Sequence, residues 1–295
     1  MTDSGRADWV PERTDDGSWT LRHPLHGEAC HSTAGAWSEA WERYVVPCAL
    51  EERARGAESP LRLLDVGTGL GLNVAAAVAA TARASMASGS THGARLDVVT
   101  LESDASVLDA AGELARAGLD PGGERALAAT RRSIEAARKG LRPIGGPSDE
   151  TGLRGDAEIR IEAPGERERV LGTLTLVLGD ARRTLPALAE RAHFDAVFLD
   201  PFSPSRAPEL WEPSFLREVA RTMAPGAWLS TYSAAYAVRL GLARAGLRVG
   251  VGPPVGRKAE GTLASPDLDP PPLAPAVRAR LERDLAEASG AAADA

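Results

Sequence analysis

The sequence predicts an α/β protein built on a doubly wound, mostly parallel sheet, with a small N-terminal β-hairpin and helix as an extension. Between Leu61 and Leu242, short apolar runs of strand length alternate with segments of helical spacing, which is typical of a parallel sheet covered by helices. Acidic residues follow several of these runs, at the strand ends where open α/β sheets bind ligands. A chain of 295 residues is long enough for one large domain of this kind. We expect the extension over residues 1–50, the α/β domain over residues 51–270 and a tail over residues 271–295.

Composition and charge exclude several classes of protein. The chain is 43% apolar and has no apolar run of the about 18 residues that a membrane span needs, so none is expected. The first nine residues are charged and lack an apolar stretch, which is not the pattern of a signal peptide, and we expect a cytoplasmic protein. The formal net charge of −7 argues mildly against a nucleic-acid binder, although a local basic patch suffices for one.

Cysteine and histidine content argues against a metal site. Cys30 and Cys48 are the only cysteines, which is too few for a disulfide framework. His23, His26 and His31 are close in sequence, but their spacing matches no zinc motif. We therefore expect no metal.

The first fifty residues predict a hairpin followed by a helix. Asp16-Gly17 is a turn signal, and the residues from Ser18 to Leu21 read as the returning strand. Aromatic residues then recur at helical spacing from Trp37 to Val46, where Pro47 follows.

A glycine-rich turn follows the first strand of the α/β domain. The buried strand Leu61–Val66 leads into Gly67, Gly69 and Gly71, and an Ala/Val-rich helix continues to about Ala82. Glycines allow the chain to turn sharply and allow a ligand to approach the helix N-terminus. The spacing is G-x-G-x-G rather than the dinucleotide fingerprint G-x-G-x-x-G. Residues 83–94 read as a loop insertion.

Three acidic residues stand at or near the ends of predicted strands, and the first of them, Asp65, precedes Gly67 by two residues. Glu102 follows the strand Leu96–Leu101, where a carboxylate can accept both ribose hydroxyls of a nucleoside. Asp180 follows the strand Thr173–Leu178, where an adenine edge can donate to it. Each carboxylate can instead cap or favour the helix that follows. Because Asp65, Glu102 and Asp180 occur together at three strand ends, we favour a nucleoside site.

The segment between these strands is less regular. Residues 104–139 predict two helices broken near residues 120–123 by Asp-Pro-Gly-Gly. Residues 140–168 are rich in Gly, Pro and charge, and we interpret them as an exposed excursion with one short strand at Ala157–Ile161.

Asp200 directly follows the strand Ala196–Leu199, and Pro201, which has no backbone N–H to donate, ends the strand pairing there. Asp200 is therefore expected at the mouth of the ligand crevice, with Phe202 beside it. The alternative is that Asp200 caps the next helix and Phe202 packs in the core.

The C-terminal third completes the alternation. We expect a helix from Pro208 to Met223, a strand at Trp228–Tyr232 and a helix from Ala235 to Ala245. Two closing strands, Leu247–Val251 and Gly261–Ser265, flank a compact basic loop that contains Arg257 and Lys258. A short helix is expected after the Pro-rich stretch that begins at Pro266.

Two blocks of the sequence resemble methyltransferases of the MnmC/MnmD type, which complete the 5-methylaminomethyl group on the wobble uridine of tRNA. The first block comprises Asp16-Gly17-Ser18, His31-Ser32, Gly35-Ala36, Glu39 and the stretch from Asp65 to Asn73. The second comprises Gly179-Asp180-Ala181, Phe194-Asp195-Ala196, Asp200, Phe202-Ser203-Pro204, Pro208-Glu209-Leu210-Trp211, Thr231-Tyr232-Ser233, Val238-Arg239, Ala245-Gly246-Leu247, Gly256-Arg257-Lys258 and Gly261-Thr262. The D-x-F-S-P and P-E-L-W elements are fairly specific, whereas many methyltransferases share the glycine turn and G-D-A.

The resemblance implies a Rossmann-like class I methyltransferase domain over residues 51–270, with S-adenosylmethionine as cofactor and tRNA as partner. The residues implied for the cofactor are Asp65, which suits its amino group, and Gly67, Gly69, Gly71, Asn73, Glu102 and Asp180. Asp200 would meet the substrate amine as the catalytic residue, since a carboxylate can orient an N–H and take the released proton. The residues implied for the substrate are Ser32, Glu39, Phe202, Tyr232, Arg257 and Lys258. Of these, Phe202 and Tyr232 would stack on a flipped uracil or else pack in the core, and Arg257 and Lys258 would approach phosphate or else lie in a solvated loop.

The sequence also departs from the family pattern. Pro201 replaces a small residue, Ala207 replaces an Asn, and residues 83–94 and 117–168 are longer than usual. The oxidase half of two-domain relatives is absent, so we expect a stand-alone methyltransferase and a separate enzyme that supplies the aminomethyl-uridine. One alternative is methylation of a small-molecule or protein amine. A second is aminopropyl transfer from the decarboxylated cofactor, against which Asp65 argues because it suits an intact methionine amino group. A third is a non-catalytic tRNA- or nucleotide-binding module.

Overall fold

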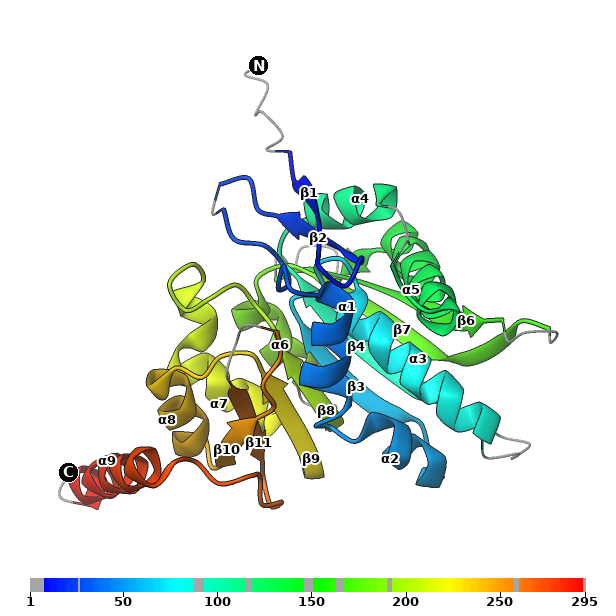
Figure 1. The fold of residues 1–295 in the computed structure, drawn as a ribbon. Coiled ribbons are helices and arrows are strands. Elements are labelled where there is room, and N and C mark those ends of the chain that lie inside the picture. Colours follow the sequence, from blue (N-terminus) through cyan, green and yellow to red (C-terminus); the bar gives the residue numbers. More distant parts are fainter. Residues whose placement is uncertain are drawn as a thin grey trace.

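A nine-stranded mixed sheet forms the centre of the protein, which is described here from a computed structural model (Figure 1). The structure describes residues 8–25, 27–87, 93–114, 118–145, 151–162, 167–189, 193–256 and 260–293. The order of strands across the sheet is β10-β11-β9-β8-β3-β4-β7-β6-β5. Their bounds are β3 Leu61–Val66, β4 Leu96–Glu102, β5 Arg142–Pro143, β6 Leu153–Ile161, β7 Arg169–Leu178, β8 Phe194–Leu199, β9 Met223–Thr231, β10 Arg248–Gly252 and β11 Gly261–Ser265.

The five central strands, β9, β8, β3, β4 and β7, pair in parallel, and the outer strands pair antiparallel. Consecutive residues of β3 face opposite cores: Leu63 packs in one hydrophobic cluster and Leu64 in the other, and both are fully buried. Burial on both faces explains why the central strands are continuous apolar runs rather than alternating ones. The predicted doubly wound, mostly parallel sheet is thus confirmed.

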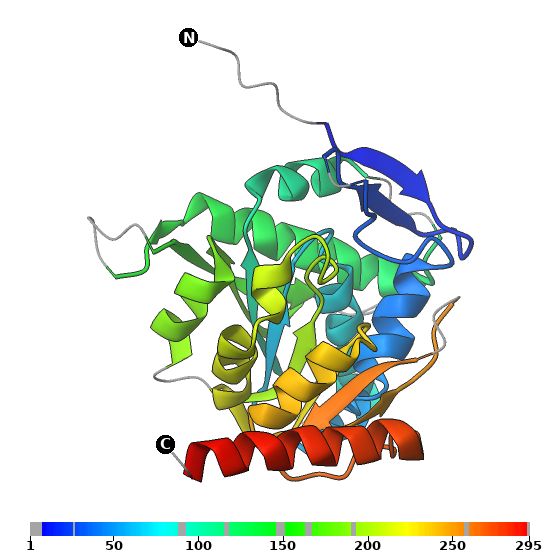
Figure 2. The same ribbon diagram turned by 90° about the vertical axis from the view of Figure 1, so that its left-hand side faces the viewer.

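Helices cover both faces of the sheet (Figures 1 and 2). One cluster contains α2, α3, α5 and the π-helix η1, and the other contains α6, α7 and α8. Their bounds are α2 Leu50–Gly56, α3 Leu72–Ala87, α4 Ala105–Glu113, α5 Pro121–Lys139, α6 Ala181–Ala189, α7 Pro213–Arg221, α8 Tyr236–Arg244 and α9 Pro275–Ala293, with η1 at Ala40–Val45 and the 3-10 turn η2 at Pro208–Trp211. None of the helices described is both long enough and apolar enough to cross a membrane.

The N-terminal segment folds as expected into a hairpin and a helix. Strands β1 (Val10–Arg13) and β2 (Trp19–Arg22) pair antiparallel around Asp16-Gly17, and α1 (Ala36–Glu39) continues into η1. The hairpin lies beside α4 in both views of the ribbon. One link is the Trp9 indole, which donates to the Ser106 hydroxyl at 2.9 Å.

Three predictions about the elements were wrong. Residues 140–168 are not only an excursion, because β6 is a nine-residue strand of the main sheet whose Ala157, Ile159 and Ile161 pack with the core beside α5. Residues 83–87 are helical rather than a loop, since α3 continues over a run of good helix formers. The helix expected at residues 208–223 is divided, because Pro213 holds Glu212 in extended backbone and starts a new helix.

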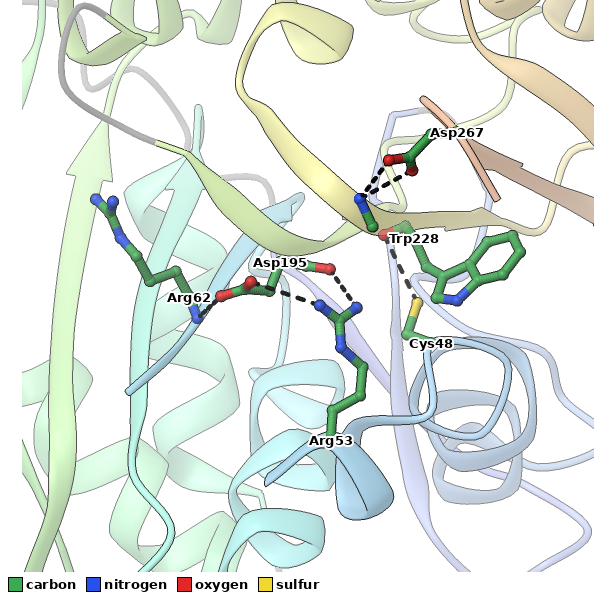
Figure 3. A network of polar contacts seen from close by, with 7 residues as sticks. Cys48, Arg53, Arg62, Asp195, Trp228 and Asp267 are labelled. Atoms are coloured by element: carbon green, nitrogen blue, oxygen red, sulfur yellow. Dashed lines mark hydrogen bonds and ion pairs between the residues drawn. The ribbon is translucent and has the colours of Figure 1, made fainter. Parts of the chain in front are cut away.

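A polar network fastens α2 to the amino ends of the central strands (Figure 3). The Arg53 guanidinium donates to the Asp195 carbonyl at 2.8 Å and pairs with its carboxylate at 3.5 Å. The same carboxylate accepts the Arg62 backbone N–H at 2.8 Å. Asp195 thereby fixes the start of β8 against β3, at the end of the strand opposite Asp200.

Candidate active site

A cavity of about 990 Å³ opens at the carboxyl ends of β3, β4, β7 and β8. The turns after these strands supply its floor, through Gly67, Glu102, Asp180 and Asp200 among others. The N-terminal segment supplies another wall, through Trp9, Arg22, residues 27–33 and Glu39. This volume is at the upper end of the range for small-molecule sites, so it leaves room for two ligands side by side.

Gly67 allows the ends of β3 and β8 to approach each other closely. Its φ of +98° is a left-handed conformation, and a Cβ there would lie 2.6 Å from the Asp200 carbonyl oxygen. The Asp200 N–H donates to the Val66 carbonyl at 3.0 Å, which closes this junction. Gly69 also lines the cavity, but Gly71 is not among the described residues that do. A Cβ on Gly71 would instead meet Ile134 of α5 at 3.2 Å.

Glu102 is fixed by three backbone donors. Its Oε1 accepts the N–H groups of Ser103 at 2.8 Å and Asp104 at 2.9 Å, and its Oε2 accepts that of Gly69 at 3.0 Å. Burial raises the pKa of Glu102, and these donors oppose the increase. Because a carboxylate has about four acceptor positions, one direction at Oε2 remains for a ligand hydroxyl in this arrangement.

Asp180 lines the same cavity and is paired with its neighbour Arg182. The guanidinium donates to both carboxylate oxygens, at 2.6 to 3.0 Å, and the Arg182 backbone N–H donates to Oδ1 at 2.9 Å. The hydrogen bonds from Arg182 hold the pKa of Asp180 below its usual value although burial opposes them. Asp180 is therefore an ionised acceptor at the cavity wall.

Asp65 is not among the described residues that line the cavity. Its side chain is fully buried, and Oδ2 accepts the Thr100 hydroxyl at 2.7 Å. Burial raises the pKa of Asp65 well above its usual value, and the charges of Asp200 and Glu102 raise it further. The predicted contact of Asp65 with a cofactor amino group stays a prediction.

Asp200 is half-buried and faces the cavity from the end of β8. Its Oδ2 accepts the Asn73 side-chain N–H at 2.7 Å. Asn73, which we expected to bind cofactor, is 3% exposed and donates its amide N–H to Asp200. It is not among the described residues that line the cavity.

The two predicted aromatic residues both line the cavity. Phe202 stacks with Trp9 at 6.4 Å between ring centroids and meets the edge of His23 at 5.4 Å. Tyr232 donates its hydroxyl to the Pro201 carbonyl at 3.0 Å and packs edge-on against Trp211. Each ring is held by neighbours and still presents surface to the cavity.

The other predicted substrate residues have different outcomes. Glu39 and Ser32 both line the cavity, and Glu39 Oε2 accepts the Ser32 backbone N–H at 2.6 Å. This bond holds the chain segment after β2 against α1. Arg257 and Lys258 lie outside the described residues.

Sequence reasoning missed several cavity residues. Trp9 and Glu28 come from the N-terminal segment, and Glu28 accepts the Ser203 hydroxyl at 2.8 Å from the turn after β8. Cys30 also lines the wall, where burial and the nearby charges of Glu102 and Asp200 raise the pKa of its thiol. The thiol stays protonated, so it is a poor nucleophile. No local pattern marks these residues, because their partners are distant in sequence.

The cavity wall is predominantly acidic. Glu28, Glu39, Glu102, Asp180 and Asp200 all line it. Such a wall favours ligands that carry positive charge, such as a sulfonium or an ammonium group. Among the residues described, no group of three or more His, Cys, Asp or Glu side chains has the arrangement of a metal site.

Comparisons with known proteins place this geometry among methyltransferases. Residues 160–267 match a family described as S-adenosyl-L-methionine-dependent methyltransferase. Two curated relatives are named tRNA 5-methylaminomethyl-2-thiouridine biosynthesis bifunctional protein MnmC. The protein from Ralstonia nicotianae is 50% identical over 93 residues, which is 32% of this chain and 14% of the relative. The protein from Chromobacterium violaceum is 40% identical over 117 residues, which is 37% of this chain and 17% of the relative.

A solved structure extends the similarity to nearly the whole chain. The crystal structure of MNMC2 from Aquifex aeolicus superposes with a TM-score of 0.70 and 27% identity, over 94% of this chain and 77% of that one. These matches confirm the resemblance predicted from the sequence and the Rossmann-like methyltransferase fold, and the matched family supports S-adenosylmethionine as cofactor. The chain nevertheless covers only 14% and 17% of the length of these two curated relatives.

Proposed function

We propose that this protein is an S-adenosylmethionine-dependent methyltransferase that N-methylates the 5-aminomethyl group on the wobble uridine of tRNA, giving 5-methylaminomethyl(-2-thio)uridine. The observation that carries the proposal is the position of Asp200: it faces an acidic cavity at the junction of β3 and β8, beside the glycine turn. In the sheet, β4 and β7 lie on one side of β3, and β8 and β9 lie on the other. Open α/β folds usually bind ligands at such a point, where the order of the strands reverses.

The residues of the cavity fit S-adenosylmethionine. Gly67 and Gly69 let the backbone approach a ligand, the remaining acceptor direction of Glu102 suits a ribose hydroxyl, and Asp180 suits an adenine amino group. Asp65 would act on the amino end, and Gly71 and Asn73 would support the turn rather than touch the cofactor. When bound, the cofactor supplies a methyl group already activated on a positively charged sulfur.

Asp200 performs the protein's part of the chemistry. Its carboxylate accepts an N–H of the neutral substrate amine and thereby aims the nitrogen lone pair at the methyl carbon. As the N–C bond forms and the S–C bond breaks, the nitrogen becomes positively charged and its proton passes to Asp200. Walls from the N-terminal segment restrict water at the reacting nitrogen.

Other residues that line the cavity would serve the substrate. Phe202 and Tyr232 offer ring surface to a flipped base, and Ser32 and Glu39 flank the same space. Arg257 and Lys258 would approach RNA phosphate. The protein would act in the cytoplasm through its domain at residues 51–270, and a separate enzyme would deliver tRNA that already carries the aminomethyl group.

A second candidate is methylation of a small-molecule or protein amine. The acidic wall favours any cationic amine, and two of the cavity arginines, Arg22 and Arg182, are already paired with carboxylates. Both features would serve a non-RNA substrate equally well.

Methyl transfer to two tRNA pools tests the proposal. One pool comes from cells that lack the wobble methyltransferase, and the other is fully modified. We expect label from S-adenosylmethionine in the first pool only, lost in Asp200→Ala and retained in Asp269→Ala, a control whose carboxylate is 88% exposed in an ion pair with Arg248. Cofactor binding without label in either pool would reject tRNA and favour a small amine. RNA binding without any methyl transfer would favour a non-catalytic module.

A further inference from the structure

A buried tyrosine of the N-terminal segment packs against the strand that leads to Asp200. The helix that begins at Ala36 widens into the π-helix η1, a geometry that is rare and often marks functional positions. Tyr44 lies in this π-helix and is fully buried, with its ring 5.3 Å from that of Phe198, two residues before Asp200 on β8.

The Tyr44 hydroxyl is buried close to the charge of Asp200. Among the described residues, no hydrogen bond of good geometry involves its oxygen. Burial raises the pKa of Tyr44 well above its usual value, and the charge and hydrogen-bonding of Asp200 raise it further. The phenol therefore keeps its proton and is available as a hydrogen-bond donor.

Asn73 supplies a second neutral donor from a different element. It lies in the first turn of α3, and its Nδ2 donates to Asp200 Oδ2 at 2.7 Å. Asn73 and Tyr44 are 3% and 0% exposed, and neither is on the described cavity wall. Asn73 thus reaches the carboxylate from the protein interior, and Tyr44 is buried beside the strand that leads to Asp200, while Asp200 itself lines the cavity.

We infer that Tyr44 and Asn73 are positioning residues that hold the Asp200 carboxylate in one orientation and favour its ionised form. Two neutral donors stabilise a carboxylate without adding a further positive charge beside a cationic substrate. A fixed carboxylate keeps the substrate nitrogen aimed at the methyl carbon, so the kinetic part of this inference depends on the proposed function.

Other titratable groups also face Asp200. They are Cys30 after β2, Arg43 in η1, Asp65 in β3 and Tyr232 after β9. These groups are unchanged when Tyr44 or Asn73 is replaced. A difference between wild type and variant therefore reports the two donors rather than this background.

Two conservative variants and one matched control test the inference. Tyr44→Phe removes only the hydroxyl, and Asn73→Leu removes the amide at similar size. Tyr236→Phe is the control, because Tyr236 also donates its hydroxyl to a carboxylate, that of Asp284 at 2.7 Å, but between α8 and α9. All three are assayed for the pH dependence of kcat on aminomethyl-uridine tRNA and for cofactor binding.

Loss of a donor to an ionised carboxylate makes protonation easier. We expect the acidic limb of the kcat profile to move to higher pH by about one unit in each active-site variant, and kcat on the plateau to fall about tenfold. Cofactor affinity should change less than about twofold, and Tyr236→Phe should match wild type. An acidic limb that stays in place in both Tyr44→Phe and Asn73→Leu would overturn the inference.

A measurement without turnover separates this inference from the proposed function. The carboxyl carbons of ¹³C-labelled aspartate are titrated by NMR in the cofactor-free protein, and the Asp200 signal is identified by its loss in Asp200→Asn. We expect its midpoint to rise in both variants, even if wild type methylates no tRNA. An unchanged midpoint in a folded Asn73→Leu protein would refute the positioning role regardless of how Tyr44→Phe folds.

Discussion

Replacing Gly67 by alanine tests how tightly the cavity floor is built. Gly67 has a φ of +98°, and an added Cβ would lie 2.6 Å from the Asp200 carbonyl oxygen and 3.1 Å from its carbonyl carbon. Both contacts are with backbone, so no side chain can rotate away to relieve them. We expect Gly67→Ala to force the ends of β3 and β8 apart and to displace Asp200.

The expected destabilisation has two parts. A non-glycine residue in the left-handed region costs about 1 kcal/mol. The carbonyl oxygen must also retreat by several tenths of an ångström, which stretches the 3.0 Å hydrogen bond from Asp200 to Val66 and adds about 1–3 kcal/mol. The total is about 2–4 kcal/mol in the free energy of unfolding, measured by urea denaturation.

Gly246→Ala separates the two parts. Gly246 has a similar φ of +91°, but an added Cβ would meet nothing within 4 Å. This control should lose only the conformational part, about 1 kcal/mol, and should keep full cofactor affinity. Equal destabilisation of the two variants would refute the argument that Gly67 is required by the approach of Asp200.

Three further outcomes follow from charged groups elsewhere. Asp65→Asn should stabilise the cofactor-free protein at neutral pH, because burial raises the pKa of Asp65 and the folded protein forgoes the favourable ionisation that the unfolded chain gains. The gain is about 1.4 kcal/mol for each pH unit from 3.8 up to the assay pH or the folded pKa, whichever is lower, so it should shrink as pH falls toward 3.8, as followed by urea denaturation from pH 4 to 8. Asp195→Ala should lower the free energy of unfolding by about 1–3 kcal/mol, because it removes the carboxylate that accepts the Arg62 backbone N–H and pairs with Arg53, whereas Asp269→Ala should change it by less than about 0.5 kcal/mol; similar values for both would count against the network. Asp16→Ala should weaken both thermal stability and cofactor retention. Burial opposes ionisation of Asp16, but its hydrogen bonds prevail and lower its pKa to about 2, so wild type should lose this contribution only as pH falls from 3.8 toward 2. A variant with unchanged cofactor retention would show that the hairpin does not matter to the cavity.

The positions of the main site residues could be predicted because parallel strands end at one edge of a sheet. Asp200, Glu102 and Asp180 each follow a recognisable apolar run, and all three reach the same cavity. Local pattern also identified the hairpin around Asp16. Strand β6 had a usable signal as well, since charged residues alternate with Ala157, Ile159 and Ile161, but its Gly and charge content obscured it.

The rest of the site depends on contacts that local pattern does not encode. Glu28 meets Ser203 across 175 residues of sequence, and Trp9 meets Ser106 across 97. Tyr44 reads in the sequence as one of several aromatic residues on a helix, and only the structure shows that it is buried near Asp200. The direction of the Asn73 side chain likewise depends on how close β8 lies to α3.

The arrangement of α9 offers a practical route to attaching the protein to a surface. Helix α9 packs against α8, and both views of the ribbon place it on the opposite side of the molecule from the hairpin that borders the cavity. Both native cysteines are unsuited to coupling, because Cys48 is buried and burial raises the pKa of Cys30. An Ala279→Cys variant would place one exposed thiol on α9, so that immobilisation or a fluorescent label there leaves the cavity mouth open to a large substrate.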